Sequence, residues 1–157
     1  MFAELMLGST DDQIRRGVND LDVFDFGGTA CSCAPRLDAA RVAIVTTAGL
    51  RNDGAGTWAD GQGYVVLDDR DRDLVLAHVS PNFDRVGVAA DLNVVYPVDR
   101  LHELVASGVI GSVASQHISF MGAQPDHTLT TLRLDTGPAA ARILADDGVD
   151  VVLLTPV

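Results

Sequence analysis

Two thiols carry the strongest redox chemistry in this sequence, Cys31 and Cys33, which are separated by one serine. A thiolate is both a nucleophile and an electron donor, so a close pair of cysteines suggests thiol–disulfide chemistry. The spacing strains a disulfide ring, and two thiols alone do not complete a tetrahedral zinc site. Two interpretations therefore stay open: free thiols in a reducing compartment, or a redox-active pair.

The sequence has four histidines, and an imidazole can donate a proton near neutral pH. The alternative is a packed, hydrogen-bonded structural histidine. His78, His102 and His127 share no ligand spacing, so the sequence indicates no metal site. No Gly-x-Gly-x-x-Gly follows residues 42–47, so the fingerprint of an NAD site is absent and no cofactor is evident.

Strand and helix patterns alternate from residue 41 onward and must position these groups. Short β-branched runs predict strands at 41–49, 63–67, 74–79, 92–96, 112–121 and 149–155, and amphipathic patterns predict helices at 97–105 and 138–147. The glycine-rich stretch 50–63 reads as a long loop. We therefore expect an α/β domain over residues 41–157, with a mainly parallel, Rossmann-like sheet flanked by helices. Residues 1–40 are expected to form a partly irregular N-terminal extension.

The run at 149–155 predicts a strongly buried strand, yet the sequence stops two residues later, at Val157. A buried strand needs cover on both faces. Either a partner covers this edge, or the domain is incomplete and belongs to something longer, or 149–157 is simply the last strand of a small domain.

The charge and hydropathy of the chain exclude several classes of partner. The net charge of −11 would repel the phosphates of nucleic acids and of anionic membranes. No apolar run approaches the roughly 20 residues of a membrane-spanning helix, and the first residues lack the pattern of a secretory signal. We therefore expect a cytoplasmic protein that binds neither nucleic acid nor membrane.

Five segments, in order, resemble the selenoprotein family of glycine, sarcosine, betaine and D-proline reductases. They are RVAIVTTAGL (41–50), DLNVVYPVDRL (91–101), GVIGSVA (108–114), HISFMG (117–122) and DGVDVVLLTPV (147–157). The resemblance implies an oxidoreductase subunit that reductively cleaves a C–N bond of a small amino-acid-like substrate, with electrons supplied by thiols. It further implies oligomeric assembly, homomeric or heteromeric.

In this family a loop carrying selenocysteine or cysteine follows the strand that corresponds to 149–155. The sequence ends at Val157, directly before that position. Three explanations are open: truncation at a selenocysteine codon, a split gene whose remainder is another chain, or a degenerate relative. Whether the chain as it stands is an enzyme is therefore open. The alternative function is a non-catalytic assembly or binding subunit that docks on a partner through the terminal strand.

The resemblance also implies a set of site residues. His117 would donate a proton to the leaving amine. Cys31 and Cys33, which lie outside the matched segments, are redox candidates that could act as resolving thiols. The expected substrate-binding residues are Thr46, Thr47, Gly49, Asn93, Arg100, Met121, Gly122 and Thr155. For the threonines the alternative is local hydrogen bonding at a strand end, and for Arg100 it is a surface role.

Overall fold

The computed structural model describes residues 12–13, 15–16, 20, 27–28, 32–53, 63–81, 83–124 and 126–157. The chain divides into two compact units, Met1–Cys33 and Ala34–Val157. In the described part of the first unit, the backbone N–H of Asp20 donates a hydrogen bond to the carbonyl of Arg16. The second unit contains every strand described below.

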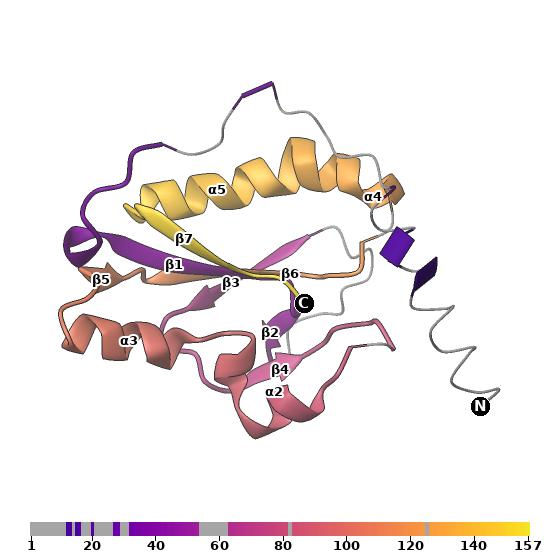
Figure 1. Cartoon of the computed structure of the whole chain (residues 1–157), viewed down its shortest axis with the longest axis horizontal. Coiled ribbons are helices and arrows are strands. Elements are labelled where there is room, and N and C mark those ends of the chain that lie inside the picture. Colours follow the sequence, from indigo (N-terminus) through magenta and orange to yellow (C-terminus); the bar gives the residue numbers. More distant parts are fainter. Residues whose placement is uncertain are drawn as a thin grey trace. The chain divides into compact units, whose positions relative to one another are not determined.

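The central strand of the second unit is β1 (Arg41–Thr46). One of its edges pairs in parallel with β7 (Val151–Thr155) along residues 42–46. Since β7 occupies that edge, the other edge pairs in parallel with β5 (Ser112–Val113) and then with β6 (Gln116–Phe120). The carboxyl ends of β1, β6 and β7 therefore lie at the same end of the sheet (Figure 1).

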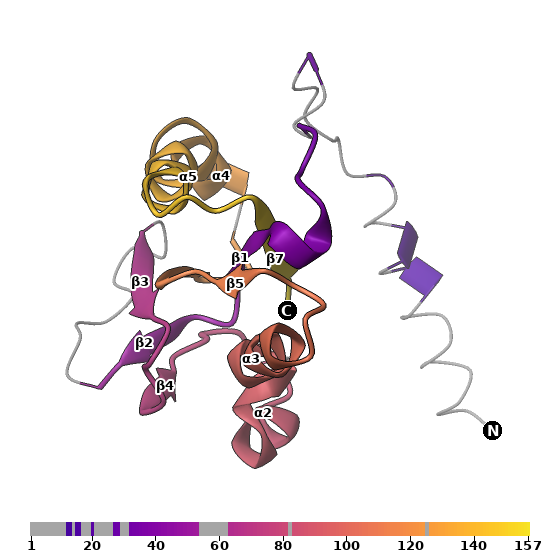
Figure 2. The same ribbon diagram turned by 90° about the vertical axis from the view of Figure 1, so that its left-hand side faces the viewer.

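Two further pairings make the sheet mixed rather than wholly parallel. The edge strand β3 (Tyr64–Asp68) runs antiparallel to β6. A separate two-stranded antiparallel sheet consists of β2 (Leu50–Asn52) and β4 (Leu74–Leu76). The predicted α/β class is confirmed, but the Rossmann-like parallel sheet is not, because these strands give a curled, mixed arrangement (Figure 2).

The alternation of side chains along β1 explains its central place. Val42 and Ile44 pack into the core on one face, and Ala43 packs into the core on the other. A strand with apolar side chains on both faces is stable only between two layers. The sequence of β1 therefore requires helices above and below it.

Helices supply those two layers (Figures 1 and 2). On one face lie α4 (Asp126–Thr131), the π-helix η3 (Leu132–Thr136) and α5 (Gly137–Asp146). On the other lie α2 (Val86–Ala90), the 3₁₀ helix η2 (Leu92–Val94) and α3 (Val98–Ala106), while the 3₁₀ turn η1 (Leu37–Ala39) precedes β1. Gly108 and Gly148, which follow α3 and α5, have φ of 73° and 72°, as helix-ending glycines do.

The predicted strand at 92–96 is wrong, because residues 92–94 form η2. The Asp91 carboxylate accepts a hydrogen bond from the Asn93 backbone N–H at 2.9 Å, which turns the chain at once. Such side-chain capping outweighs the β-branched character of the following valines. Residues 50–52, interpreted from sequence as loop, form β2 instead.

The burial expected for the terminal strand is also wrong. β7 pairs with β1 as expected, yet Val152, Leu153 and Leu154 are 41%, 39% and 67% exposed. Only one edge of β7 is paired among the described strands, and the helical layers centre on β1. β7 therefore lies at an edge of the sheet, although its apolar composition is that of an interior strand.

Candidate functional site

The candidate site lies where β1, β6 and β7 end together. Thr46 and Thr47 stand at the end of β1, Met121 and Gly122 directly follow β6, and Thr155 closes β7. Open α/β sheets commonly place their binding and reactive groups at this edge of parallel strands. The structure thus brings together six of the predicted site residues: Thr46, Thr47, Gly49, Met121, Gly122 and Thr155.

The Thr47 hydroxyl holds the end of β7 in place. Its Oγ1 donates to the carbonyl of Val157 at 3.2 Å and accepts from the N–H of Val157 at 2.9 Å. The Thr155 hydroxyl donates to the carbonyl of Val95 at 2.9 Å, and the Thr46 hydroxyl accepts from the N–H of Ala48. These hydroxyls position backbone, and their role in binding a substrate stays a prediction.

Two glycines let backbone and side chains approach closely at this edge. A Cβ on Gly122 would lie 2.8 Å from His78 Nε2 and 2.9 Å from the carbonyl oxygens of Thr47 and Val157. Gly49 has a φ of 66°, and its Cβ would lie 2.9 Å from Met121 Cε. Neither position accommodates a larger residue without displacement, so both glycines shape the site.

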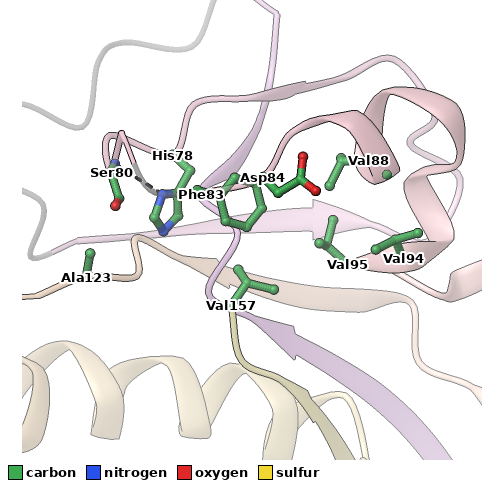
Figure 3. Close-up of a pocket in the computed structure, with 10 residues that line it drawn as sticks. His78, Ser80, Phe83, Asp84, Val88, Val94, Val95, Ala123 and Val157 are labelled. Carbon is green, nitrogen blue, oxygen red and sulfur yellow. Dashed lines mark hydrogen bonds between the residues drawn. The ribbon is translucent and has the colours of Figure 1, made fainter. Parts of the chain in front are cut away.

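Val157 stands between two cavities. A cavity of about 530 Å³ opens on the α2 side of the sheet, where Val157 and Val95 meet His78 and Phe83 (Figure 3). A second, of about 460 Å³, opens on the α4 side, between Val45, Phe120 and Leu129. Both cavities are lined by Val157, so the end of β7 is accessible from either face of the sheet.

His78 belongs to this site, although the sequence patterns did not select it. It follows β4, is only 5% exposed, and lies beside Gly122 and the end of β7. Burial, and to a lesser extent the charge of Arg85, lowers the pKa of His78 below its ordinary value. The usable signal was its position two residues after Leu76, in phase with the inward-facing residues of an apolar run.

Two predicted binding residues lie away from this edge. Asn93 bridges the start of α3: its amide donates to Asp91 and Asp99, and its Oδ1 accepts from the backbone N–H of Asp99. Arg100 is exposed on α3 and forms an ion pair with Glu103 at 2.9 Å. The structure gives both residues local partners on the α3 face.

His117, the predicted proton donor, lies near the amino end of β6 and is fully buried. Its Nδ1 accepts the backbone N–H of Ile44 at 2.9 Å, and its ring meets Tyr96 edge-on. Its Nε2 is 3.6 Å from the Asp69 carboxylate, beyond hydrogen-bonding distance. Burial lowers the pKa of His117, while Asp69 raises it in part. His117 therefore lies away from the carboxyl edge, in a packed and hydrogen-bonded position, and its role as a proton donor stays a prediction.

The remaining expectations concern metals, thiols and membranes. Within the described ranges, no group of three or more His, Cys, Asp or Glu side chains is arranged to bind a metal ion. Cys33 is a free, exposed thiol, and Cys31 lies outside the described residues. In the part of the chain that the structure describes, no helix has the length and apolarity needed to cross a bilayer.

Comparison with known proteins gives the family. The model for glycine/sarcosine/betaine reductase selenoprotein B matches residues 30–157, more than half of the chain. D-proline reductase subunit gamma of Acetoanaerobium sticklandii is 34% identical over 118 residues, covering 73% of this chain. That match covers 47% of the relative, so the chain spans about half the relative's length. No solved structure matches. The chain belongs to the glycine/sarcosine/betaine reductase selenoprotein B family.

Proposed function

We propose that the chain is part of a dithiol-dependent reductase complex, and that the edge around Thr47 and Val157 is the place of reaction. The observation that carries this proposal is the meeting of three strand ends at Val157 between two cavities. Family membership and the likeness to a D-proline reductase subunit support it. We call the two hydrogen bonds between the Thr47 hydroxyl and the Val157 backbone the Thr47 clamp. A reactive cysteine or selenocysteine that follows Val157 would be held by this clamp at the openings of both cavities.

The reaction proposed is the reductive cleavage of a C–N bond in a small amino-acid-like substrate. Two electrons and two protons convert C–N into C–H and N–H, and a dithiol that becomes a disulfide supplies both. The chalcogen nucleophile would displace the amine from the substrate carbon, and a thiol would then attack the chalcogen and release that carbon as C–H. The second thiol of the dithiol would reduce the resulting mixed disulfide or selenenyl sulfide and restore the nucleophile. In this chain, the Thr47 hydroxyl, which bonds both the N–H and the carbonyl of Val157, would position that nucleophile.

The test begins with the DNA that follows the codon of Val157. We expect an in-frame UGA or cysteine codon, and we expect the extended polypeptide, assembled with its companion subunits, to couple dithiol oxidation to loss of D-proline or glycine. The 157-residue chain in the same assembly should show no turnover. A different stop codon with no cysteine-containing continuation, or turnover by the short chain, would contradict the mechanism.

A matched pair of threonine variants tests the clamp in the extended polypeptide. Thr47→Val removes only the hydroxyl that holds Val157, and we expect kcat to fall by about tenfold or more as the nucleophile loses its position. Thr136→Val is the control, since in the described structure its buried hydroxyl has no hydrogen-bond partner. Equal kcat values for the two variants would remove Thr47 from the proposed mechanism.

The exposed apolar edge of β7 favours a second candidate function, a non-catalytic assembly subunit. Leu154 is 67% exposed on a strand with one edge unpaired among the described residues. Exposed strand edges of this kind accept a further strand from another chain. The two functions differ in what they require: the first needs the cavities, and the second needs only the strand.

A further inference from the structure

The α2-side cavity contains a fixed histidine ring to which neither the motifs nor the family assigns a role. The ring of His78 stacks on Phe83, with centroids 4.6 Å apart. The guanidinium of Arg85 donates to the carbonyl of His78 at 2.6 Å and so fixes its backbone. The imidazole therefore has one defined orientation at the wall of the cavity (Figure 3).

The hydrogen bond at Nδ1 determines the tautomer of this ring. The backbone N–H of Ser80 donates to His78 Nδ1 at 3.2 Å, so Nδ1 must be unprotonated. A neutral imidazole then carries its proton on Nε2. The lowered pKa of His78, caused mainly by burial, agrees with a neutral ring at pH 7. His78 is thus a neutral N–H donor.

That donor has no acceptor in the described structure. Nε2 is buried, and no hydrogen-bond partner reaches it among the described residues. It points toward the turn after β6 and the end of β7, where Ala123 and Val157 line the cavity (Figure 3). A buried donor without an acceptor costs folding free energy. A buried polar group without a partner requires an explanation, and a ligand in the neighbouring cavity would supply the missing acceptor.

The turn that covers Nε2 is itself in a conformation of high energy. Ala123 has a φ of 52°, in the left-handed region that a non-glycine residue rarely adopts. Gly122, directly before it, is the residue whose missing Cβ leaves room for Nε2. A ligand oxygen that reaches Nε2 would therefore have to displace this turn.

We propose that the α2-side cavity binds a small molecule with a compact apolar body and a carbonyl or carboxylate oxygen, and that His78 Nε2–H donates to that oxygen. The cavity wall is largely apolar: Phe83, Val88, Val94, Val95 and Val157 line it. Its volume of about 530 Å³ is within the range of small-molecule sites. The identification of this molecule as the substrate rests on the proposed function, whereas its binding does not.

The charges near the cavity leave open which acceptor it prefers. Arg85 brings a positive charge close to His78, and Asp84 brings a carboxylate whose Oδ1 accepts the N–H of Val86. A neutral carbonyl and a carboxylate both accept from an imidazole N–H. The probes must therefore share one apolar body and differ only in the polar group.

The direct test is a titration of the 157-residue chain, labelled on its histidine rings, with three tert-butyl compounds. Pivalate carries a carboxylate, pivalamide carries a neutral carbonyl, and tert-butylammonium carries no acceptor. We expect saturable shifts of the His78 Nε2–H resonance with pivalate or pivalamide, and none with tert-butylammonium. Whichever acceptor binds more tightly gives the preferred charge. Absence of a saturable His78 shift with both acceptors, or an equal shift with tert-butylammonium, overturns the proposal.

Variants separate donation from packing. His78→Gln keeps an N–H near the Nε2 position and should retain affinity within a few-fold, whereas His78→Phe keeps the stacking on Phe83 and should bind about tenfold more weakly. His102→Gln, at an exposed histidine of α3, is the matched control and should bind like the wild type. Equal affinity of His78→Phe and the wild type overturns the donor role. If His78→Phe does not fold, the wild-type resonance still decides.

This experiment can fail independently of the reductase proposal. It measures binding by the chain as it stands, with no dithiol and no turnover. Probe binding through His78, together with an inactive extended polypeptide, would retain the ligand site and remove the reductase function. An active extended polypeptide whose His78 resonance does not respond to the probes would retain the reductase function and remove the ligand site.

Discussion

Two buried histidines each accept a backbone N–H at Nδ1, His78 in the loop after β4 and His117 in β6. Ser80 N–H donates to His78 beyond the carboxyl end of β1, and Ile44 N–H donates to His117 near the amino end of β6. Both bonds leave the proton on Nε2. What distinguishes the two rings is their surroundings: His78 meets a cavity, whereas His117 meets Tyr96 and the core.

The sequence could not separate these two roles. His117 was selected from a run that matches a family segment, and its alternation within 116–120 is equally typical of a core residue. His78 follows the three-residue strand β4, and its phase with Leu74 and Leu76 predicts an inward-facing side chain but does not indicate a cavity. By contrast, Thr46, Thr47, Gly122 and Thr155 were named from segments that resemble the family, and the structure brings them together because the parallel strands β1, β6 and β7 end at one edge.

His117→Leu tests the packed role. The change leaves the buried N–H of Ile44 without its acceptor, so we expect the free energy of unfolding to fall by about 1–3 kcal/mol. The pKa of His117 is lowered in the folded state below its ordinary value of 6.5. The contribution of neutral His117 to the free energy of unfolding is therefore full above pH 6.5 and is lost as the pH falls below that value. Urea unfolding from pH 7 to pH 5 should therefore show a weaker pH dependence for the variant.

Hydrogen exchange at the Ile44 amide gives a second measurement, and this amide should exchange faster in His117→Leu. The exposed His102→Leu is the control, with unchanged exchange at Ile44. A His117→Leu protein as stable as the wild type, with the same pH dependence, would show that the Ile44 bond contributes little.

At the scale of elements, the amino ends of the strands are tied by one carboxylate. Asp147, just after α5, accepts from Arg41 Nη2 at 2.8 Å and from the Ser115 hydroxyl at 2.7 Å. It also accepts the backbone N–H groups of Ser115 and Gln116. Partial burial raises the pKa of Asp147, but these hydrogen bonds outweigh it and bring the pKa to about 2.

Asp147→Asn should loosen β1 from β6 at this end. We expect a loss of about 1–3 kcal/mol in the free energy of unfolding, because an amide cannot accept at every position where the carboxylate does. The stabilisation by Asp147 is present above pH 3.8 and is lost as pH falls toward 2, so the difference from wild type should shrink on acidification. Chemical unfolding at pH 7 and pH 3 measures both effects.

Asp146→Asn, at the adjacent exposed carboxylate, is the matched control and should unfold like the wild type. Equal stabilities of the two variants at pH 7 would show that Asp147 does not join these strands energetically.

Most elements could be predicted from the sequence where local and tertiary signals agree. The apolar run at 41–46 and the amphipathic pattern at 98–106 gave β1 and α3. At 92–96 they disagree: three of the five residues favour a strand, but Asp91 and Asn93 form side-chain bonds that start a turn. Composition shows which residues prefer burial, and it does not show which strand becomes an edge.

At the scale of the whole molecule, β7 raises the question of assembly. The assembly function predicts that the 157-residue chain associates through this edge. Leu154→Lys should shift the chain to monomers in sedimentation velocity, because a charge on an exposed strand blocks strand addition. Leu134→Lys, on η3 and equally exposed at 66%, should leave association unchanged. A wild-type chain that is a stable, folded monomer would contradict this function.

The partition formed by Val157 has a consequence for the order of chemical events. Under the proposed function, a chalcogen that follows Val157 would be open to one molecule from the α2-side cavity and to another from the α4-side cavity. The reductant could then reach the oxidised chalcogen through one cavity while the first product still occupies the other. Two separate cavities of this kind favour a cycle in which substrate and dithiol approach the same chalcogen atom from opposite faces of the sheet, so that neither has to leave before the other binds.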